Sequence, residues 1–196
     1  MISNGRARLV ILISGRGSNM VSIIEAIDAN QLDADIVAVI SNRPDATGSV
    51  AAADRGIPTA VVDHTEYQDR DSFDRALAET VDRFNPHLVI LAGFMRILTA
   101  DFVNHYANKL LNIHPSLLPQ FKGLNTHQRA IDAKASEHGA TVHFVTAELD
   151  DGPIVLQAKV PVLADDDAQT LAKRVLIQEH QLYPNAIKKI IQERAL

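Results

Sequence analysis

The fold is decided near the start of the chain, where residues 9–19 read Leu-Val-Ile-Leu-Ile-Ser-Gly-Arg-Gly-Ser-Asn. Five consecutive apolar residues indicate a strand buried on both faces. The two glycines then let the backbone turn sharply into a helix predicted over 20–29, which has Ile23, Ile24 and Ile27 on one face. A buried strand, a glycine-rich turn and a helix in this order are typical of an α/β protein with a parallel sheet.

The same alternation continues along the chain. Apolar runs predict further strands over 36–40, 59–62, 88–91, 110–114, 140–145 and 154–160, and helical spacing predicts helices over 50–55, 69–84, 99–106, 126–134 and 166–191. Thr99 is expected to cap its helix, and Pro184 is expected to kink or break the last one. We predict one domain over residues 1–196 with a single doubly wound, mostly parallel sheet and helices on both faces, a Rossmann-like α/β fold.

Composition excludes several classes of protein. The 196 residues are 46% hydrophobic and 22% charged, with a net charge of −5 and no cysteine, so there is no disulfide framework, thiolate metal site or cysteine nucleophile. An acidic chain with few aromatic residues and no basic run is a poor candidate for binding nucleic acid. No segment approaches the ~20 apolar residues of a membrane span, and five are too few for a signal peptide. A cytoplasmic protein without a membrane partner is expected.

The loop over 14–19 is the first candidate site, because ligands of doubly wound sheets bind beyond the carboxyl ends of the strands. Its glycines present backbone N–H groups at a helix N-terminus, which favours an anion. Met20 stands where the dinucleotide motif has a third glycine, and no Gly-Lys-Ser/Thr sequence of a P-loop is present. We interpret the loop as a phosphate-monoester site with Ser18 and Asn19 as additional donors. The alternative is a turn that merely caps the helix.

A second candidate site lies at the end of the strand over 110–114. Asn112 and His114 are two residues apart, so their side chains face the same side of the strand, and Pro115 ends it. An amide at this position can stabilise an oxyanion and an imidazole can move a proton near neutral pH. The alternative is a structural histidine beside an asparagine that ends a strand.

A carboxylate in the turn over 148–153 could orient this imidazole and raise its pKa. The turn contains both Asp150 and Asp151, and position alone does not choose between them. No metal site is expected, because the histidines form no His-Glu-x-x-His frame and His138 and His143 are five residues apart.

Four segments together resemble the folate-dependent phosphoribosylglycinamide formyltransferase family. They are Gly-Arg-Gly-Ser-Asn over 15–19, Leu-Ala-Gly-Phe-Met-Arg-Ile-Leu over 91–98, Asn-Ile-His-Pro-Ser-Leu-Leu-Pro over 112–119, and the stretch over 143–153. The resemblance covers nearly the whole chain, as far as the Gln-Glu-His segment at 178–180. Lys122, Asn125 and Asp151 stand where many members have Pro, His and Gly.

The resemblance implies a reaction and roles for residues. A formyl group would move from 10-formyltetrahydrofolate, as cosubstrate, to the amine of 5'-phosphoribosylglycinamide (GAR) in purine biosynthesis, without a metal. It implies a catalytic set of Asn112, His114 and Asp150. The GAR phosphate would lie on Gly17, Ser18 and Asn19 and the ribose on Glu179, whereas the folate would lie on Met95, Arg96, Ile97, Leu98 and Asn112, with its anionic tail on Arg70.

Other functions share parts of this pattern. Formyltetrahydrofolate hydrolase and methionyl-tRNA formyltransferase carry the same catalytic motif but usually a further domain, for which this chain has little room. A non-catalytic phosphate-sugar sensor could use the same scaffold but would not need the catalytic set. The expected partners are small molecules, with a monomer or a homodimer as the assembly.

Overall fold

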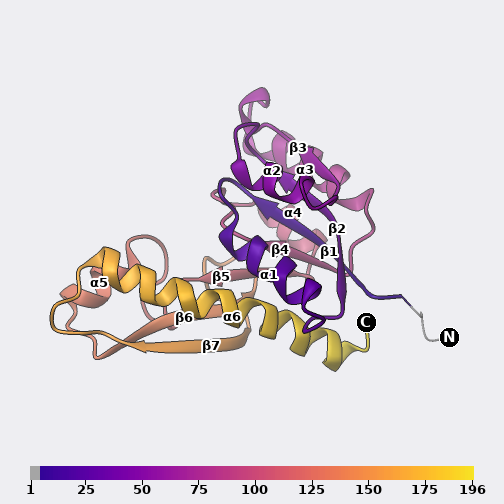
Figure 1. Ribbon diagram of the computed structural model, residues 1–196. Helices are drawn as coiled ribbons and strands as arrows, with labels where there is room; N and C mark the ends of the chain where they lie inside the picture. The colour runs from indigo at the N-terminus through magenta and orange to yellow at the C-terminus, as the bar shows by residue number, and fades with distance from the viewer. Residues whose placement is uncertain (1–4) are drawn as a thin grey trace.

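The computed structural model describes residues 5–196, which build a seven-stranded sheet of order β3-β2-β1-β4-β5-β6-β7 (Figure 1). Neighbouring strands from β3 across to β5 are parallel, whereas β6 pairs antiparallel with β5 and β7 with β6. The strands are β1 (Ala7–Ile13), β2 (Ala34–Ser41), β3 (Thr59–Val61), β4 (Leu88–Leu91), β5 (Leu110–His114), β6 (Glu137–Phe144) and β7 (Ile154–Pro161). The predicted fold class, a mostly parallel α/β sheet, is confirmed.

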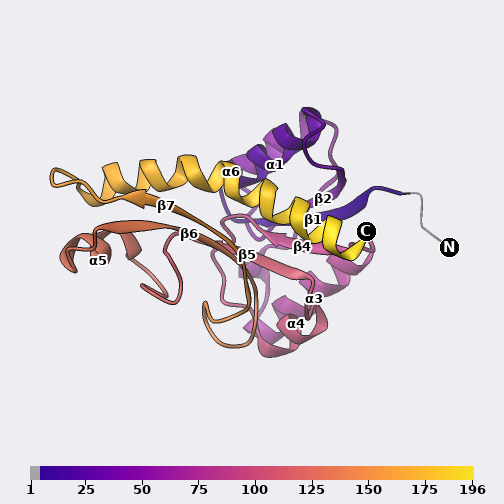
Figure 2. The ribbon, with the colours of Figure 1, turned by 90° about the horizontal axis from the view of Figure 1, so that it is seen from below.

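Helices cover both faces of the sheet. They are α1 (Ser18–Asp28), α2 (Thr47–Ala53), α3 (Arg70–Asp82), α4 (Ala100–His105), α5 (Thr126–Asp132) and α6 (Ala168–Arg194), with a 3-10 turn over His64–Glu66. Figure 2 shows α1 and α6 on one side of the sheet and α3 and α4 on the other. Among residues 5–196, none of these helices combines the length and apolarity that a membrane crossing requires.

Alternating side chains of β1 supply both halves of the core. Leu9, Ile11 and Ile13 belong to the apolar cluster beneath α1 and α6, whereas Val10 and Leu12 belong to the cluster beneath α3 and α4. All five side chains are fully buried. Burial on both faces explains why this strand is a continuous apolar run rather than an alternating one.

The predicted helix starts are supported by side-chain caps. The Asp69 carboxylate accepts a hydrogen bond from Ser72 N at the start of α3, and Thr99 Oγ1 accepts one from Phe102 N at the start of α4, which confirms Thr99 as a cap. Such caps satisfy N–H groups that the first turn leaves without a partner.

Of the kink or break predicted at Pro184, the break is wrong, because α6 runs from Ala168 to Arg194 without interruption (Figure 1). A proline inside a helix costs about 3 kcal/mol through a lost hydrogen bond and a clash. Packing around it offsets that cost: Tyr183, Ala186 and Ile187 are fully buried. The Tyr183 hydroxyl also lies 2.9 Å from Leu91 O and 3.1 Å from Leu111 O, so it anchors the helix to β4 and β5.

The strand β6 begins at Glu137, three residues before its predicted start at 140. Gly139 is therefore part of the strand. A Cβ at this position would lie 1.9 Å from Ala158 O, so β7 can approach only a glycine here. The glycine therefore reflects a close approach of two strands, not a turn. The longer hairpin of β6 and β7 extends together with α6 away from the parallel strands (Figure 2).

The strand order changes direction between β1 and β4. The chain runs from β1 outward to β3 and then returns to β4 on the other side of β1. The carboxyl ends of β1 and β4 therefore meet at the switch point of the sheet, where doubly wound proteins bind their ligands.

Candidate active site

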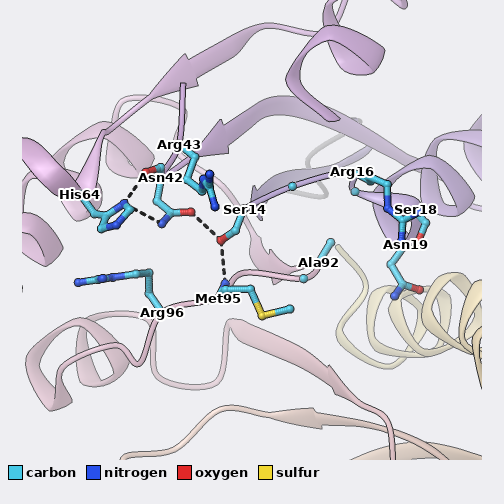
Figure 3. Close-up of a pocket in the computed structure, with 13 residues that line it drawn as sticks. Ser14, Arg16, Ser18, Asn19, Asn42, Arg43, His64, Ala92, Met95 and Arg96 are labelled. Atoms are coloured by element: carbon cyan, nitrogen blue, oxygen red, sulfur yellow. Dashed lines mark hydrogen bonds between the residues drawn. The ribbon is translucent and has the colours of Figure 1, made fainter. Parts of the chain in front are cut away.

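The phosphate loop, residues Ser14–Asn19, joins β1 to α1. Gly17 has φ 66° and ψ 40°, a left-handed conformation that glycine adopts at little cost, and no side chain caps the helix that follows. The first N–H groups of α1 are therefore free of a side-chain partner and can receive an anion. A cavity of about 380 Å³ opens over this loop, and Figure 3 shows Ser18 and Asn19 on one side of it, beside the ribbon of α6.

A buried carboxylate lies next to this loop. Glu179 on α6 accepts a hydrogen bond of 2.8 Å from Asn19 Nδ2, and each residue is 8% exposed. Burial raises the pKa of Glu179, and the hydrogen bond from Asn19 acts against that rise. The structure thus brings together two residues 160 positions apart that the sequence predicts for the same ligand.

The predicted catalytic residues meet where β5, β6 and the turn after β6 come together. Asp150 Oδ2 lies 3.4 Å from His114 Nδ1, and both side chains are 8% exposed. His114 Nε2 lies 2.9 Å from Phe121 O, and Asp150 Oδ2 also accepts a hydrogen bond from Gly123 N at 2.9 Å. Asp150, and not Asp151, therefore faces the imidazole.

The neighbouring Asp151 points elsewhere. Its exposed carboxylate pairs with Lys122, so the two charged departures from the common family pattern are partners of each other. This pair joins the loop after β5 to the turn after β6, directly beside Asp150.

His143 is a member of this group that the sequence does not single out as a site residue. In the antiparallel register it lies opposite Asn112, with Asn112 Nδ2 at 3.4 Å from His143 Nε2, and its Nε2 is 3.8 Å from Asp150 Oδ1. Burial lowers its pKa, with the Asp150 carboxylate acting against that change. The signal that could have found it is the pairing of β6 with β5, which places the two residues side by side.

The neutral ring of His143 orients the Asn112 amide. His143 Nδ1 lies 2.9 Å from Phe144 O and donates to it, which leaves Nε2 as the acceptor for Asn112. One N–H of the Asn112 amide is thereby used, and the other is left for a ligand.

The loop over 92–98 follows β4 and contributes to two cavities. Met95, 78% exposed, lines the cavity over the phosphate loop. Arg96, Ile97 and Leu98 line a second cavity of about 200 Å³ whose other walls include Asn112, His143 and Asp150. Arg96, Ile97 and Leu98, three of the residues predicted for the folate, thus border the predicted catalytic residues.

Arg70 is not part of either cavity. It is the exposed first residue of α3. Its predicted contact with an anionic tail remains a prediction about a ligand that extends beyond the cavities. In residues 5–196, no group of three or more His, Asp or Glu side chains is arranged to hold a metal ion.

Fold and site together define an α/β enzyme in which a glycine-rich loop at a helix N-terminus and a group of an amide, an imidazole and a carboxylate lie at the same edge of the sheet. The sequence model of the formyl transferase family matches residues 7–187, and the chain belongs to this family.

Individual relatives are more specific. The chain is 49% identical to phosphoribosylglycinamide formyltransferase of Escherichia coli (strain K12) over 91% of its own length and 84% of that protein. It is 45% identical to the trifunctional purine biosynthetic protein adenosine-3 of Bos taurus, but spans 18% of that longer chain. The crystal structure of phosphoribosylglycinamide formyltransferase from Brucella melitensis superposes with a TM-score of 0.90 at 48% identity, covering 94% of this chain and 95% of that one.

Proposed function

We propose that this chain transfers the formyl group of 10-formyltetrahydrofolate to the amine of GAR, giving formyl-GAR and tetrahydrofolate in de novo purine biosynthesis. The observation that carries the proposal is the 49% identity, over 91% of the chain, to the phosphoribosylglycinamide formyltransferase of Escherichia coli. The site supports it, because this reaction needs both a holder for a phosphorylated sugar and groups that stabilise a tetrahedral oxyanion.

The phosphate loop is the proposed site for GAR. The backbone N–H groups of Gly17 and Ser18 and the Asn19 amide would hold the phosphate at the start of α1. Glu179, already hydrogen-bonded to Asn19, would accept hydrogen bonds from the ribose hydroxyls. The raised pKa of this buried carboxyl suits a group that gains its hydrogen-bond donors from the ligand.

The second cavity is the proposed site for the folate. Its lining combines the apolar residues Phe94, Ile97 and Leu98 with the polar Asn112 and Asp150, which suits a flat pterin ring with a polar edge. Arg96 borders the cavity over the phosphate loop as well, and Arg70 lies at the start of α3. These guanidinium groups would meet the carboxylates of the folate tail.

The catalytic group would act while one carbon–nitrogen bond forms and another breaks. The amine nitrogen bonds to the formyl carbon, the formyl oxygen gains negative charge, and the bond from that carbon to N10 then breaks. The free N–H of Asn112 and the His114 ring would stabilise the oxygen. The proton released by the amine reaches N10 through His114, directly or through water.

The contacts of the two His114 ring nitrogens determine what this proton transfer requires. Both ring nitrogens face oxygen acceptors, Asp150 Oδ2 on one side and Phe121 O on the other, so a protonated ring can donate on both sides. Transfer of the Nε2 proton then requires the Phe121 carbonyl to give up its hydrogen bond as the substrates bind.

A spectrophotometric assay of 10-formyltetrahydrofolate turnover, with and without GAR, tests the proposal. We expect turnover that requires GAR and is lost in His114→Ala. Folate turnover without GAR would replace the proposal with a hydrolase. If neither condition gives turnover while phosphate ligands still bind equally to both proteins, the chain is a sensor and the transferase is refuted.

A further inference from the structure

One buried hydroxyl ties together three loops at the carboxyl edge of the sheet. Ser14, which follows β1 and is 8% exposed, donates a hydrogen bond of 2.6 Å to Asn42 Oδ1 and accepts one of 2.7 Å from Met95 N (Figure 3). Asn42 follows β2, and Met95 belongs to the loop after β4. Because β1 lies between β2 and β4 in the sheet, the side chain that directly follows β1 can reach the loops after both neighbouring strands.

The partner residue Asn42 is itself held in place. It is 2% exposed, its backbone N–H donates to Ile13 O at 3.4 Å, and its Nδ2 lies 3.2 Å from His64 Nδ1. Since the carbonyl oxygen of the amide faces Ser14, the hydroxyl hydrogen points to Asn42. A lone pair of Ser14 Oγ is then left for Met95 N.

The Ser14–Met95 bond continues the pairing of β1 with β4 beyond the end of the strands. The regular register ends at Leu12 and Leu91, and Ala92 N donates to Leu12 O at 2.9 Å. In residues 5–196 the next hydrogen bond between these two segments is the one from Met95 N to Ser14 Oγ. Between the two bonds lies Gly93, with φ 74°, where the backbone turns away from the sheet.

We propose that Ser14 is a positioning residue, whose hydroxyl holds the 92–98 loop against the phosphate loop and so sets the distance between the two substrates. The inference rests on the proposed function, in which GAR lies on the phosphate loop and the folate on the 92–98 loop. The residues directly after Met95 line the second cavity together with Asn112 and Asp150. A displacement of about 1 Å between reacting groups can cost on the order of 10²-fold in rate.

Hydrogen–deuterium exchange on the ligand-free, full-length protein tests the hydrogen bond itself. In Ser14→Ala, Met95 N loses its acceptor, and we expect its amide to exchange at least about tenfold faster than in the wild type. Ser14→Thr keeps the hydroxyl and should restore slow exchange. Unchanged exchange of Met95 in Ser14→Ala would overturn the proposal. If Ser14→Ala does not fold, Asn42→Ala tests the same link by removing the second partner of the hydroxyl.

Steady-state kinetics test the consequence for the substrates. In Ser14→Ala we expect kcat to fall by up to about 10²-fold and the KM for 10-formyltetrahydrofolate to rise about tenfold, with the KM for GAR within threefold of the wild type. Gly17→Val, which strains the backbone of the phosphate loop, is the comparison variant and should raise the KM for GAR instead. Equal increases in both constants, or a lower melting temperature with unchanged constants, would overturn the positioning role.

Failure of the proposed function has a different signature. In that case the wild-type protein shows no GAR-dependent turnover, whereas the exchange of the Met95 amide still reports the hydrogen bond to Ser14.

Discussion

The two regions proposed to hold the substrates are built in different ways. The phosphate loop takes its shape from six consecutive residues and offers backbone N–H groups at the start of α1. The predicted catalytic group takes two side chains from β5, Asn112 and His114, and one each from β6 and from the turn after β6. Phe121 and Gly123, from the loop after β5, add backbone hydrogen bonds to it.

This difference predicts how each region responds to mutation. In the phosphate loop, we expect backbone conformation to matter more than any one side chain, because the groups proposed to hold the phosphate are N–H groups. In the catalytic group, each side chain carries a charge or a hydrogen bond that no neighbour can replace, because the group is buried.

The largest effect is expected from Asp150→Asn. This substitution keeps the shape of the side chain but removes the charge that faces His114 Nδ1. We expect kcat to fall by about 10²–10⁴-fold, which is the contribution of a well-placed proton-transfer group. The melting temperature should change little, because Asp150 has φ 49° in a turn, a conformation that asparagine also tolerates. Steady-state kinetics and thermal unfolding measure the two quantities.

The adjacent Asp151→Asn provides the control for charge alone. Asp151 is exposed and pairs with Lys122, and such surface pairs contribute about 0–1 kcal/mol. Its kcat should stay within about threefold of the wild type on that magnitude. Equal losses of kcat in Asp150→Asn and Asp151→Asn would show that Asp150 contributes only its negative charge and has no specific role toward His114.

A smaller effect is expected from Gly17→Val in the phosphate loop. Gly17 has φ 66°, which a β-branched residue adopts only with strain, and an added Cβ would lie 3.2 Å from Met20 Cε. We expect the KM for GAR to rise by about 10–100-fold, since strain of ~1–3 kcal/mol displaces the N–H groups. The KM for the folate should change much less.

Gly56→Val separates strain from binding. Gly56 also has a positive φ, of 72°, with open space around it, and lies after α2. This variant should lose stability in urea unfolding but keep the KM for GAR. If Gly17→Val leaves that constant unchanged, the phosphate lies elsewhere and the contrast between the two regions fails.

The smallest effect is a pH dependence of stability near the catalytic group. His138 on β6 is 1% exposed, with its Nε2 3.1 Å from His127 Nδ1, and burial lowers its pKa to about 4. The unfolded chain, with a histidine pKa of about 6.5, therefore binds more protons between pH 6.5 and 4. Folding stability should fall as the pH decreases through that window.

Urea unfolding at pH 7.5 and pH 5 measures this change. In His138→Gln the difference between the two free energies of unfolding should shrink by about 2 kcal/mol. An unchanged difference would assign the acid sensitivity to other groups.

Much of the fold could be predicted because its signals are local. The buried strands are continuous apolar runs, and helix starts such as that at Thr99 carry a capping side chain. The predictions from sequence fail where contacts between segments far apart in the chain determine the local structure. Packing on the sheet keeps α6 unbroken through Pro184, and the close approach of β7 places Gly139 inside a strand.

The site divides in the same way. Asn112 and His114 share a strand face, so their proximity follows from spacing alone. Whether Asp150 or Asp151 faces His114 depends on the conformation of the turn after β6. The position of His143 beside Asn112 depends on the antiparallel register of β5 and β6. The spacing of residues in the sequence specifies neither. The link from Ser14 to Met95 joins residues 81 positions apart, and no motif marks it.

The hydrogen bonds of Tyr183 also fix the position of α6 along its own axis. Tyr183, whose hydroxyl meets the ends of β4 and β5, lies one helical turn after Glu179, so both side chains project from the same strip of the helix. A slide of α6 by one residue would move Glu179 by about 1.5 Å along the axis, half the length of its hydrogen bond to Asn19. A change in the length of the loop between Pro161 and Ala168 is therefore expected to leave the distance from the sheet to the proposed ribose site unchanged, whereas one residue added between positions 179 and 183 would change it.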